Sequence, residues 1–167
     1  MPARKIEYRT KRKTERVRVH KERPTLTVFH VNDSTDDQVL FQAACNKAHV
    51  PIQWQVADSS ERAISMLKSI LALSKTQDVF WPDLIVLDIH MPGEKGFKVL
   101  EFIRSTPSLK AIPVVILTGL ASVHMMSQAY GLGANSFHEK PSEFQAMVEL
   151  AACLYKVWSS ALRPRLG

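Results

Sequence analysis

The sequence predicts an α/β fold in which one five-stranded parallel sheet is covered by helices on both faces. Five short runs of apolar and β-branched residues alternate with five segments whose apolar residues recur at helical spacing. Two of the runs, LIVLDI and PVVILT, are apolar on nearly every residue, which is typical of strands inside a parallel sheet. This alternation favours a doubly wound (βα)5 arrangement.

Each predicted strand is bounded by polar, proline or glycine residues. The five strands are expected at Thr25–Val31, Ile52–Val56, Leu84–Ile89, Pro113–Thr118 and Asn135–Glu139. Each helix carries an apolar stripe, and most of them follow a polar residue that is able to cap them. The helices are expected from a cap at Asp36 or Asp37 to near His49, then at Glu61–Leu73, Gly96–Arg104, Ser122–Tyr130 and Ser142–Leu162.

The charge of the chain is unevenly distributed. The 167 residues carry a net charge of +6, but residues 1–24 hold ten Lys and Arg against three Glu, so the remainder is close to neutral. We therefore expect a disordered basic tail at 1–24, one domain at 25–162 and a short tail at 163–167. The basic tail has two interpretations: an arm that binds nucleic acid or an anionic membrane surface, or a solubilising extension.

The composition of the chain indicates the cellular compartment of the protein. The longest apolar run is interrupted by Pro113 and Thr118 and falls short of the roughly 18 residues of a membrane span, so we expect no membrane segment. No secretory signal pattern follows the basic N-terminus. The two cysteines, Cys45 and Cys153, lie in apolar helical contexts and are expected to be buried thiols in a reducing compartment. A cytoplasmic location is the prediction.

Polar side chains stand at or just after the ends of four of the five predicted strands. They are Asn32, Asp33, Asp88, Thr118 and Lys140. In an open parallel sheet these ends share one edge, where ligands bind. Carboxylates there suit Mg²⁺, and a hydroxyl and an ammonium suit the oxygens of a phosphoryl group.

Three segments that contain these residues resemble the motifs of bacterial response-regulator receiver domains. They are LIVLDIHMPGEKGFKVL at 84–100, IPVVILTG at 112–119 and GANSFHEKP at 133–141. The resemblance covers residues 25–162 and implies a flavodoxin-like receiver fold. It places Asp88 at the phosphoacceptor position, Thr118 at the switch hydroxyl and Lys140 at the lysine that precedes a proline.

The resemblance also implies a chemistry. Asp88 would accept a phosphoryl group from a sensor histidine kinase, with Mg²⁺ held by Asp33, Asp88 and the backbone carbonyl of His90. Lys140 would contact a phosphoryl oxygen, with a cis peptide before Pro141. Thr118 would move toward the phosphoryl group, and Phe137 would turn inward behind it.

Three departures from the family pattern are visible. Asn32 stands where an acidic residue is usual, and its amide is expected to reach the metal only through a water molecule. Phe137 stands where tyrosine is frequent. The connection Ser74–Asp83 is lengthened, which resembles the small stand-alone receivers paired with phytochrome-type histidine kinases.

The predicted function is that of a single-domain response regulator that is not an enzyme. After the last helix only Arg163–Gly167 remain, so we expect a partner protein or self-association to carry the output. Tyr155, Trp158 and Leu162 suggest a homodimer through the last helix. The alternative is a degenerate receiver, silenced at Asn32, that serves as a phosphorylation-independent docking module.

Overall fold

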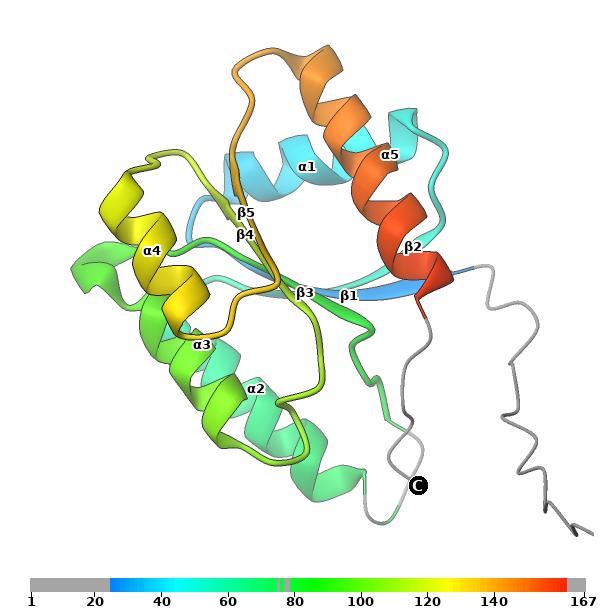
Figure 1. Ribbon diagram of the computed structural model, residues 1–167. Helices are drawn as coiled ribbons and strands as arrows, with labels where there is room; N and C mark the ends of the chain where they lie inside the picture. Colours follow the sequence, from blue (N-terminus) through cyan, green and yellow to red (C-terminus); the bar gives the residue numbers. More distant parts are fainter. Residues whose placement is uncertain (1–24, 75, 77–78, 162–167) are drawn as a thin grey trace, which may run out of the picture.

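A computed structural model describes residues 25–74, 76 and 79–161, which form five strands and five α-helices around a single sheet (Figure 1). The strands are β1 (Leu26–Val31), β2 (Ile52–Ala57), β3 (Leu84–Leu87), β4 (Val114–Thr118) and β5 (Ser136–Glu139). The helices are α1 (Thr35–Lys47), α2 (Ser60–Leu73), α3 (Gly96–Ser105), α4 (Val123–Gly131) and α5 (Phe144–Ser160), with a short 3₁₀ turn η1 (Pro92–Glu94) before α3.

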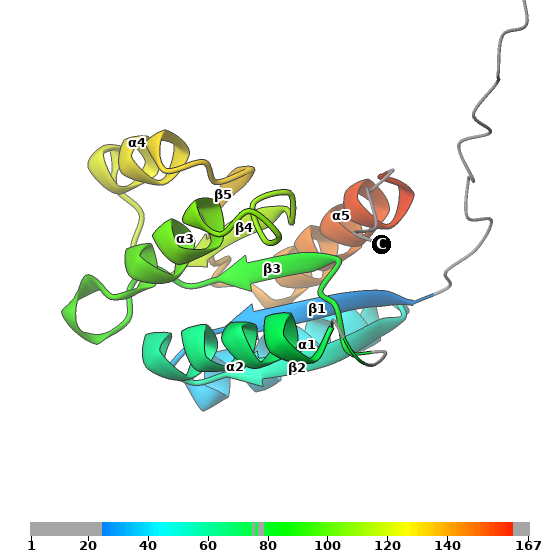
Figure 2. The same cartoon turned by 90° about the horizontal axis from the view of Figure 1, so that it is seen from below.

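All four strand pairs of the sheet are parallel, and the strand order is β2-β1-β3-β4-β5. The chain therefore runs outward from β1 to β2 and then crosses back to β3, so the direction of winding reverses at β1. The carboxyl ends of the strands point to the same edge, as the arrows of β1, β2 and β3 show in Figure 2. The crevice between the ends of β1 and β3 is the ligand position that this topology creates.

The two faces of the sheet are covered by different helices. Phe29, Ile85 and Ile116 point to the face that α2, α3 and α4 cover, and Val28, Val86 and Val115 point to the face that α1 and α5 cover. Figure 1 shows α1 and α5 together on one side and α2, α3 and α4 on the other. Neighbouring residues of a strand alternate between two cores, which explains why most residues of the central strands are apolar.

The predicted fold is confirmed, with strand and helix bounds that differ by one or two residues from those expected for most elements. The cap of the first helix was wrong. Ser34, not Asp36 or Asp37, is the N-cap of α1, and its hydroxyl accepts a hydrogen bond from the backbone N–H of Asp37. The side chain of Asp37 is therefore left for another role.

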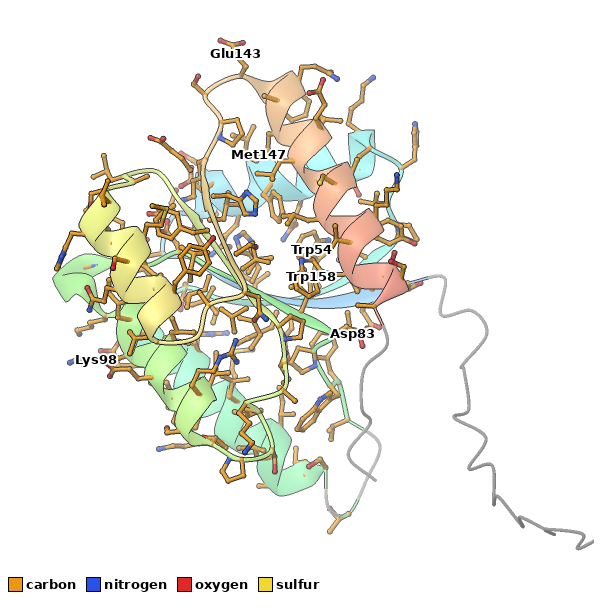
Figure 3. The ribbon with its side chains drawn as sticks, in the orientation of Figure 1. Trp54, Asp83, Lys98, Glu143, Met147 and Trp158 are labelled. Atoms are coloured by element: carbon orange, nitrogen blue, oxygen red, sulfur yellow. The ribbon has the colours of Figure 1, made fainter. Side chains whose placement is uncertain are left out.

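One expectation about side-chain burial was wrong, that for Cys153. Tyr155 and Trp158 of α5 are half-buried and pack, with Trp54 of β2, against the core that α5 shares with the sheet (Trp54 and Trp158 are labelled in Figure 3). The homodimer through these residues stays a prediction. Cys45 is buried as expected, whereas Cys153 is exposed on α5. Helix periodicity identifies an apolar stripe but does not fix which flanking residues of the stripe reach the core.

The expectations for residues 1–24, Leu162 and 163–167 lie outside the described residues. Within the described part of the chain, no helix is both long enough and apolar enough to cross a membrane.

Candidate functional site

The Lys140 ammonium lies at the centre of the predicted site and contacts two carboxylates. Its Nζ lies 2.6 Å from Asp88 Oδ2 and 2.6 Å from Asp37 Oδ2. The Asp88 side chain is only 6% exposed and that of Lys140 13%, whereas that of Asp37 is 39% exposed. The site therefore has a buried side, formed by Asp88, and an accessible side, formed by Asp37.

Backbone contacts fix Asp88 at the edge of the sheet. Its N–H donates to the carbonyl of Val31 at the end of β1 (2.9 Å), which holds the residue at the β1/β3 crevice. The backbone N–H of His90 donates to Asp88 Oδ1 (2.8 Å) while the His90 side chain itself is exposed. Each carboxylate oxygen of Asp88 thus has one donor, Oδ1 from the loop and Oδ2 from Lys140.

Gly96 allows the loop after Asp88 to pack closely against the start of α3. A Cβ atom at position 96 would lie 2.4 Å from Ile89 Cα and 2.5 Å from the carbonyl oxygen of Asp88. No side chain fits at such distances, so glycine is required here by space rather than by backbone conformation. In the same loop, Gly93 has a φ of 75°, a left-handed conformation that glycine adopts easily.

The end of β4 positions Lys140 and leaves one hydroxyl without a partner. The backbone N–H of Lys140 donates to the carbonyl of Thr118 (2.8 Å), which extends the pairing of β4 with β5. Thr118 is fully buried, and its Oγ1 has no hydrogen-bond partner among the described residues. The Lys140–Pro141 peptide bond is trans, so the expected cis bond was wrong.

Burial and the two carboxylates act on Lys140 in opposite directions. Burial by itself would lower the pKa of the ammonium, but hydrogen bonds to Asp37 and Asp88, together with their charges, raise the pKa above its ordinary value. Lys140 is therefore a permanent cation over Asp88 at neutral pH.

The end of β1 carries the two residues that the sequence assigned to a metal. Asn32 is buried, and its Oδ1 already accepts a hydrogen bond from Ser34 N–H (2.9 Å), whereas its Nδ2 has no partner among the described residues. Asp33 is exposed. The Asn32 atom without a partner is thus Nδ2, a hydrogen-bond donor, which does not suit direct contact with a cation.

The donor set at this edge fits a hard divalent cation that keeps most of its water. Within the described part of the chain, no three His, Cys, Asp or Glu side chains are grouped closely enough to enclose a metal ion. Two carboxylates, Asp33 and Asp88, and a backbone carbonyl are nevertheless a set of the kind that Mg²⁺ accepts, since it is usually bound through one or two carboxylates plus water and phosphate oxygens.

His30 is a buried residue near the site that the sequence reasoning missed. Its ring packs on Phe41 at 5.4 Å and on Trp54 at 6.0 Å between centroids. Burial lowers the pKa of His30 to about 4, with a smaller lowering by the charge of Lys140 that Asp88 and Asp37 partly oppose. A histidine inside a strand that is apolar at every other position except Thr27 was the signal available in the sequence.

Phe137, the predicted switch aromatic, lies on β5 opposite Ile116 of β4. Its side chain is partly buried and packs against the core beneath α2, α3 and α4. The inward turn of Phe137 on phosphorylation therefore stays a prediction.

Fold and site together define a signalling domain of the flavodoxin-like class, with a buried aspartate and a lysine at the switch point. The chain belongs to the response regulator receiver domain family, whose family model matches residues 28–152.

Among relatives, the chain is similar to the response regulator Rcp1 of Synechocystis, with 24% identity over 135 residues that cover 81% of this chain and 90% of Rcp1. Among solved structures it is similar to the phosphorylated cyanobacterial phytochrome response regulator RcpA, with 27% identity, a TM-score of 0.72 and coverage of 84% of this chain and 99% of RcpA. The Mn²⁺-bound form of Rcp1 shares the fold, with 22% identity, a TM-score of 0.64 and coverage of 84% and 99%.

Proposed function

We propose that this response regulator accepts a phosphoryl group on Asp88 from a sensor histidine kinase and relays the signal through protein contacts. The observation that carries the proposal is the 2.6 Å contact between Lys140 Nζ and Asp88 Oδ2 at the β1/β3 crevice. A cation held over a nearly buried carboxylate is suited to receive a phosphoryl group, because it neutralises part of the added charge.

In the proposed transfer, an Asp88 carboxylate oxygen attacks phosphorus and forms a new P–O bond. The bond from phosphorus to the donor histidine nitrogen breaks, and the imidazole leaves with the electron pair. Lys140 stays in place and contacts a phosphoryl oxygen. The unpartnered Thr118 hydroxyl donates to another, which removes the cost of a buried polar group without a partner.

We further propose that Asp33, Asp88 and the backbone carbonyl of His90 hold Mg²⁺. When bound there, the ion would neutralise phosphoryl oxygens during in-line transfer. Support comes from the donor set of the site and from the similarity to Rcp1, which has been solved in a Mn²⁺-bound form. Receiver domains are typically signalling modules, and we propose no enzymatic turnover for this one.

We place the protein contacts at α4 and its neighbours β5 and α5. The large apolar side chains Val123, Met126 and Tyr130 are exposed on α4 at positions i, i+3 and i+7, so they share one face of the helix. A homodimer through this surface would bury them. Sedimentation over a wide concentration range would show dimers of the native chain, and Val123→Glu would shift them to monomers.

Chemical trapping tests the proposed site directly. Sodium borohydride reduces an acyl phosphate of aspartate to homoserine, so a chain treated first with acetyl phosphate and Mg²⁺ should yield homoserine at position 88 in peptide mass spectra. Trapping at another carboxylate would show that the site was wrongly assigned.

The alternative, a phosphorylation-independent docking module, is favoured by Asn32. It predicts no trapped product in the native chain. If Asn32→Asp then allowed trapping, the missing carboxylate would be what silences the site.

A further inference from the structure

Asp37 is an acidic residue of the site that comes from a helix rather than from a strand end. Its Oδ2 and the Oδ2 of Asp88 both lie 2.6 Å from Lys140 Nζ, so the two carboxylates are at most twice that distance apart. Asp37 and Lys140 are 103 residues apart in the chain. The ion pair therefore connects the first turn of α1 to the end of β5.

The position of Asp37 is fixed by the way α1 begins. Ser34 caps the helix by accepting from Asp37 N–H (3.2 Å), and the side-chain amide of Gln38 donates to the carbonyl of Asn32 (2.5 Å). These two contacts tie the first turn of α1 to the end of β1. Asp37 consequently has a defined place at the mouth of the crevice, and its carboxylate needs no rearrangement to reach Lys140.

We propose that Asp37 is a positioning residue that supplies, from α1, the negative charge that the site lacks at Asn32. It holds the Lys140 ammonium and thereby strengthens the binding of a divalent cation beside Asp88. The inference rests on the proposed function, because it concerns the same site and the same metal.

The physical reason is competition between two cations for one carboxylate. The Lys140 ammonium and a divalent ion would both contact the Asp88 carboxylate. These two cations repel each other strongly, because they are close together in a poorly solvated site. Asp37 lies on the accessible side of Lys140 and offsets the ammonium charge, so Asp88 can be shared at lower cost. With Asp33, Asp37 and Asp88 against Lys140, the charge of these four groups is −2; without Asp37 it would be −1.

Metal titration of the full chain without any phosphodonor tests the proposal. Mg²⁺ binding is measured by calorimetry for the native chain, Asp37→Asn and Asp36→Asn. Asp36 is the matched control, because it precedes Asp37 in the same helical turn, is exposed, and has no side-chain hydrogen bond or ion pair among the described residues. We expect Asp37→Asn to weaken binding about three- to tenfold and Asp36→Asn to change it less than twofold.

A compensating substitution separates charge from structure. Asn32→Asp in the Asp37→Asn background returns the charge to the same edge, and we expect it to recover most of the lost affinity. A purely structural fault of Asp37→Asn would not be recovered in this way. In a phosphorylation assay, Asp37→Asn should raise the Mg²⁺ concentration for the half-maximal rate while the rate at saturating Mg²⁺ stays within about twofold of the native rate.

Three results would overturn the inference: equal Mg²⁺ affinity in Asp37→Asn and the native chain, an equal loss in Asp36→Asn, or no measurable binding by the native chain. A native chain that binds Mg²⁺ in an Asp37-dependent manner but is not phosphorylated would refute the proposed function while the role of Asp37 in metal binding stood. Different results would therefore refute the proposed function and the role of Asp37.

Discussion

Lys140 lies against Asp88 although 52 residues of sequence and the whole of β4 separate them. The contact exists because both residues follow strands of one parallel sheet, so their side chains leave the same edge. The Lys140 backbone is held by Thr118 and its ammonium by two carboxylates. Formation of the pair thus depends on the positions of three strands, β3, β4 and β5, and of helix α1.

Removal of the Lys140 charge should destabilise the fold. Lys140→Met leaves the nearly buried Asp88 carboxylate without its cation, and loss of one partner of such a pair costs roughly 3 kcal/mol of unfolding free energy. Urea denaturation would measure the loss. The double variant Lys140→Met with Asp88→Asn should recover much of it, because no buried charge then remains.

Lys98, exposed on α3 and labelled in Figure 3, provides the matched control. Lys98→Met removes the same charge from the surface and should change stability by less than about 0.5 kcal/mol. Equal stability of the Lys140 and Lys98 variants would contradict the account of the pair.

Thr118 and Thr27 offer a comparison between an unpartnered and a partnered buried hydroxyl. Thr118 Oγ1 has no partner among the described residues, whereas Thr27 Oγ1 donates to the carbonyl of Trp81 (2.8 Å) and accepts from Asp83 N–H (3.0 Å). Thr118→Val should leave the stability of the unphosphorylated protein unchanged or raise it by about 1 kcal/mol. Thr27→Val should lower it by roughly 1–3 kcal/mol. Urea unfolding of both variants checks the contrast, and a loss at Thr118 as large as at Thr27 would reveal a partner for its hydroxyl.

Gly96 should tolerate no side chain. Gly96→Ala forces a methyl group against the backbone of Asp88 and Ile89, so the start of α3 or the loop after Asp88 must move, at a cost of about 2 kcal/mol or more. Gly131→Ala is the control, because nothing lies within 4 Å of its added Cβ at the end of α4. Thermal unfolding should show a lower midpoint for the first variant and an unchanged or higher midpoint for the second.

His30 should make stability depend on pH between 5 and 7. Its pKa is lowered by burial from 6.5 to about 4, so the unfolded chain binds more protons than the folded chain in this interval. Stability therefore falls as the pH drops below about 6.5 and stops falling from this cause near pH 4. The expected loss from pH 7 to pH 5 is roughly 2 kcal/mol.

The pH dependence can be assigned by substitution. His30→Gln removes the titrating group, so its urea-unfolding free energy should change much less between pH 7 and pH 5 than that of the native chain. The groups around His30 are Phe41, Trp54, Lys140, Asp88 and Asp37. An equally steep pH dependence in His30→Gln would mean that carboxylates at the site, not the histidine, are responsible.

The strands could be predicted from the sequence because strands that are buried on both faces consist mostly of apolar residues. LIVLDI and PVVILT are apolar on nearly every residue because β3 and β4 are covered on both faces, and this predicted the parallel sheet. The same topology predicted that Asp88 and Lys140 would meet. No side-chain detail was needed for either inference, since strand ends share an edge whatever their rotamers.

Asp37 could not be assigned in the same way. An acidic residue in the first turn of a helix is an ordinary cap or dipole partner, and nothing in its local sequence indicates a lysine 103 residues away. The orientation of the Asn32 amide, the partial burial of Trp158 and the exposure of Cys153 likewise depend on packing directions that periodicity does not contain.

Intact mass spectrometry shows whether Asp88 accepts a phosphoryl group. The native chain and Asp88→Asn are incubated with acetyl phosphate and Mg²⁺, with a parallel sample in which the metal is chelated. We expect that only the native chain with Mg²⁺ gains the mass of one phosphoryl group. The same gain in Asp88→Asn, or no gain in the native chain even at high Mg²⁺ and with a histidine-kinase donor, would contradict it.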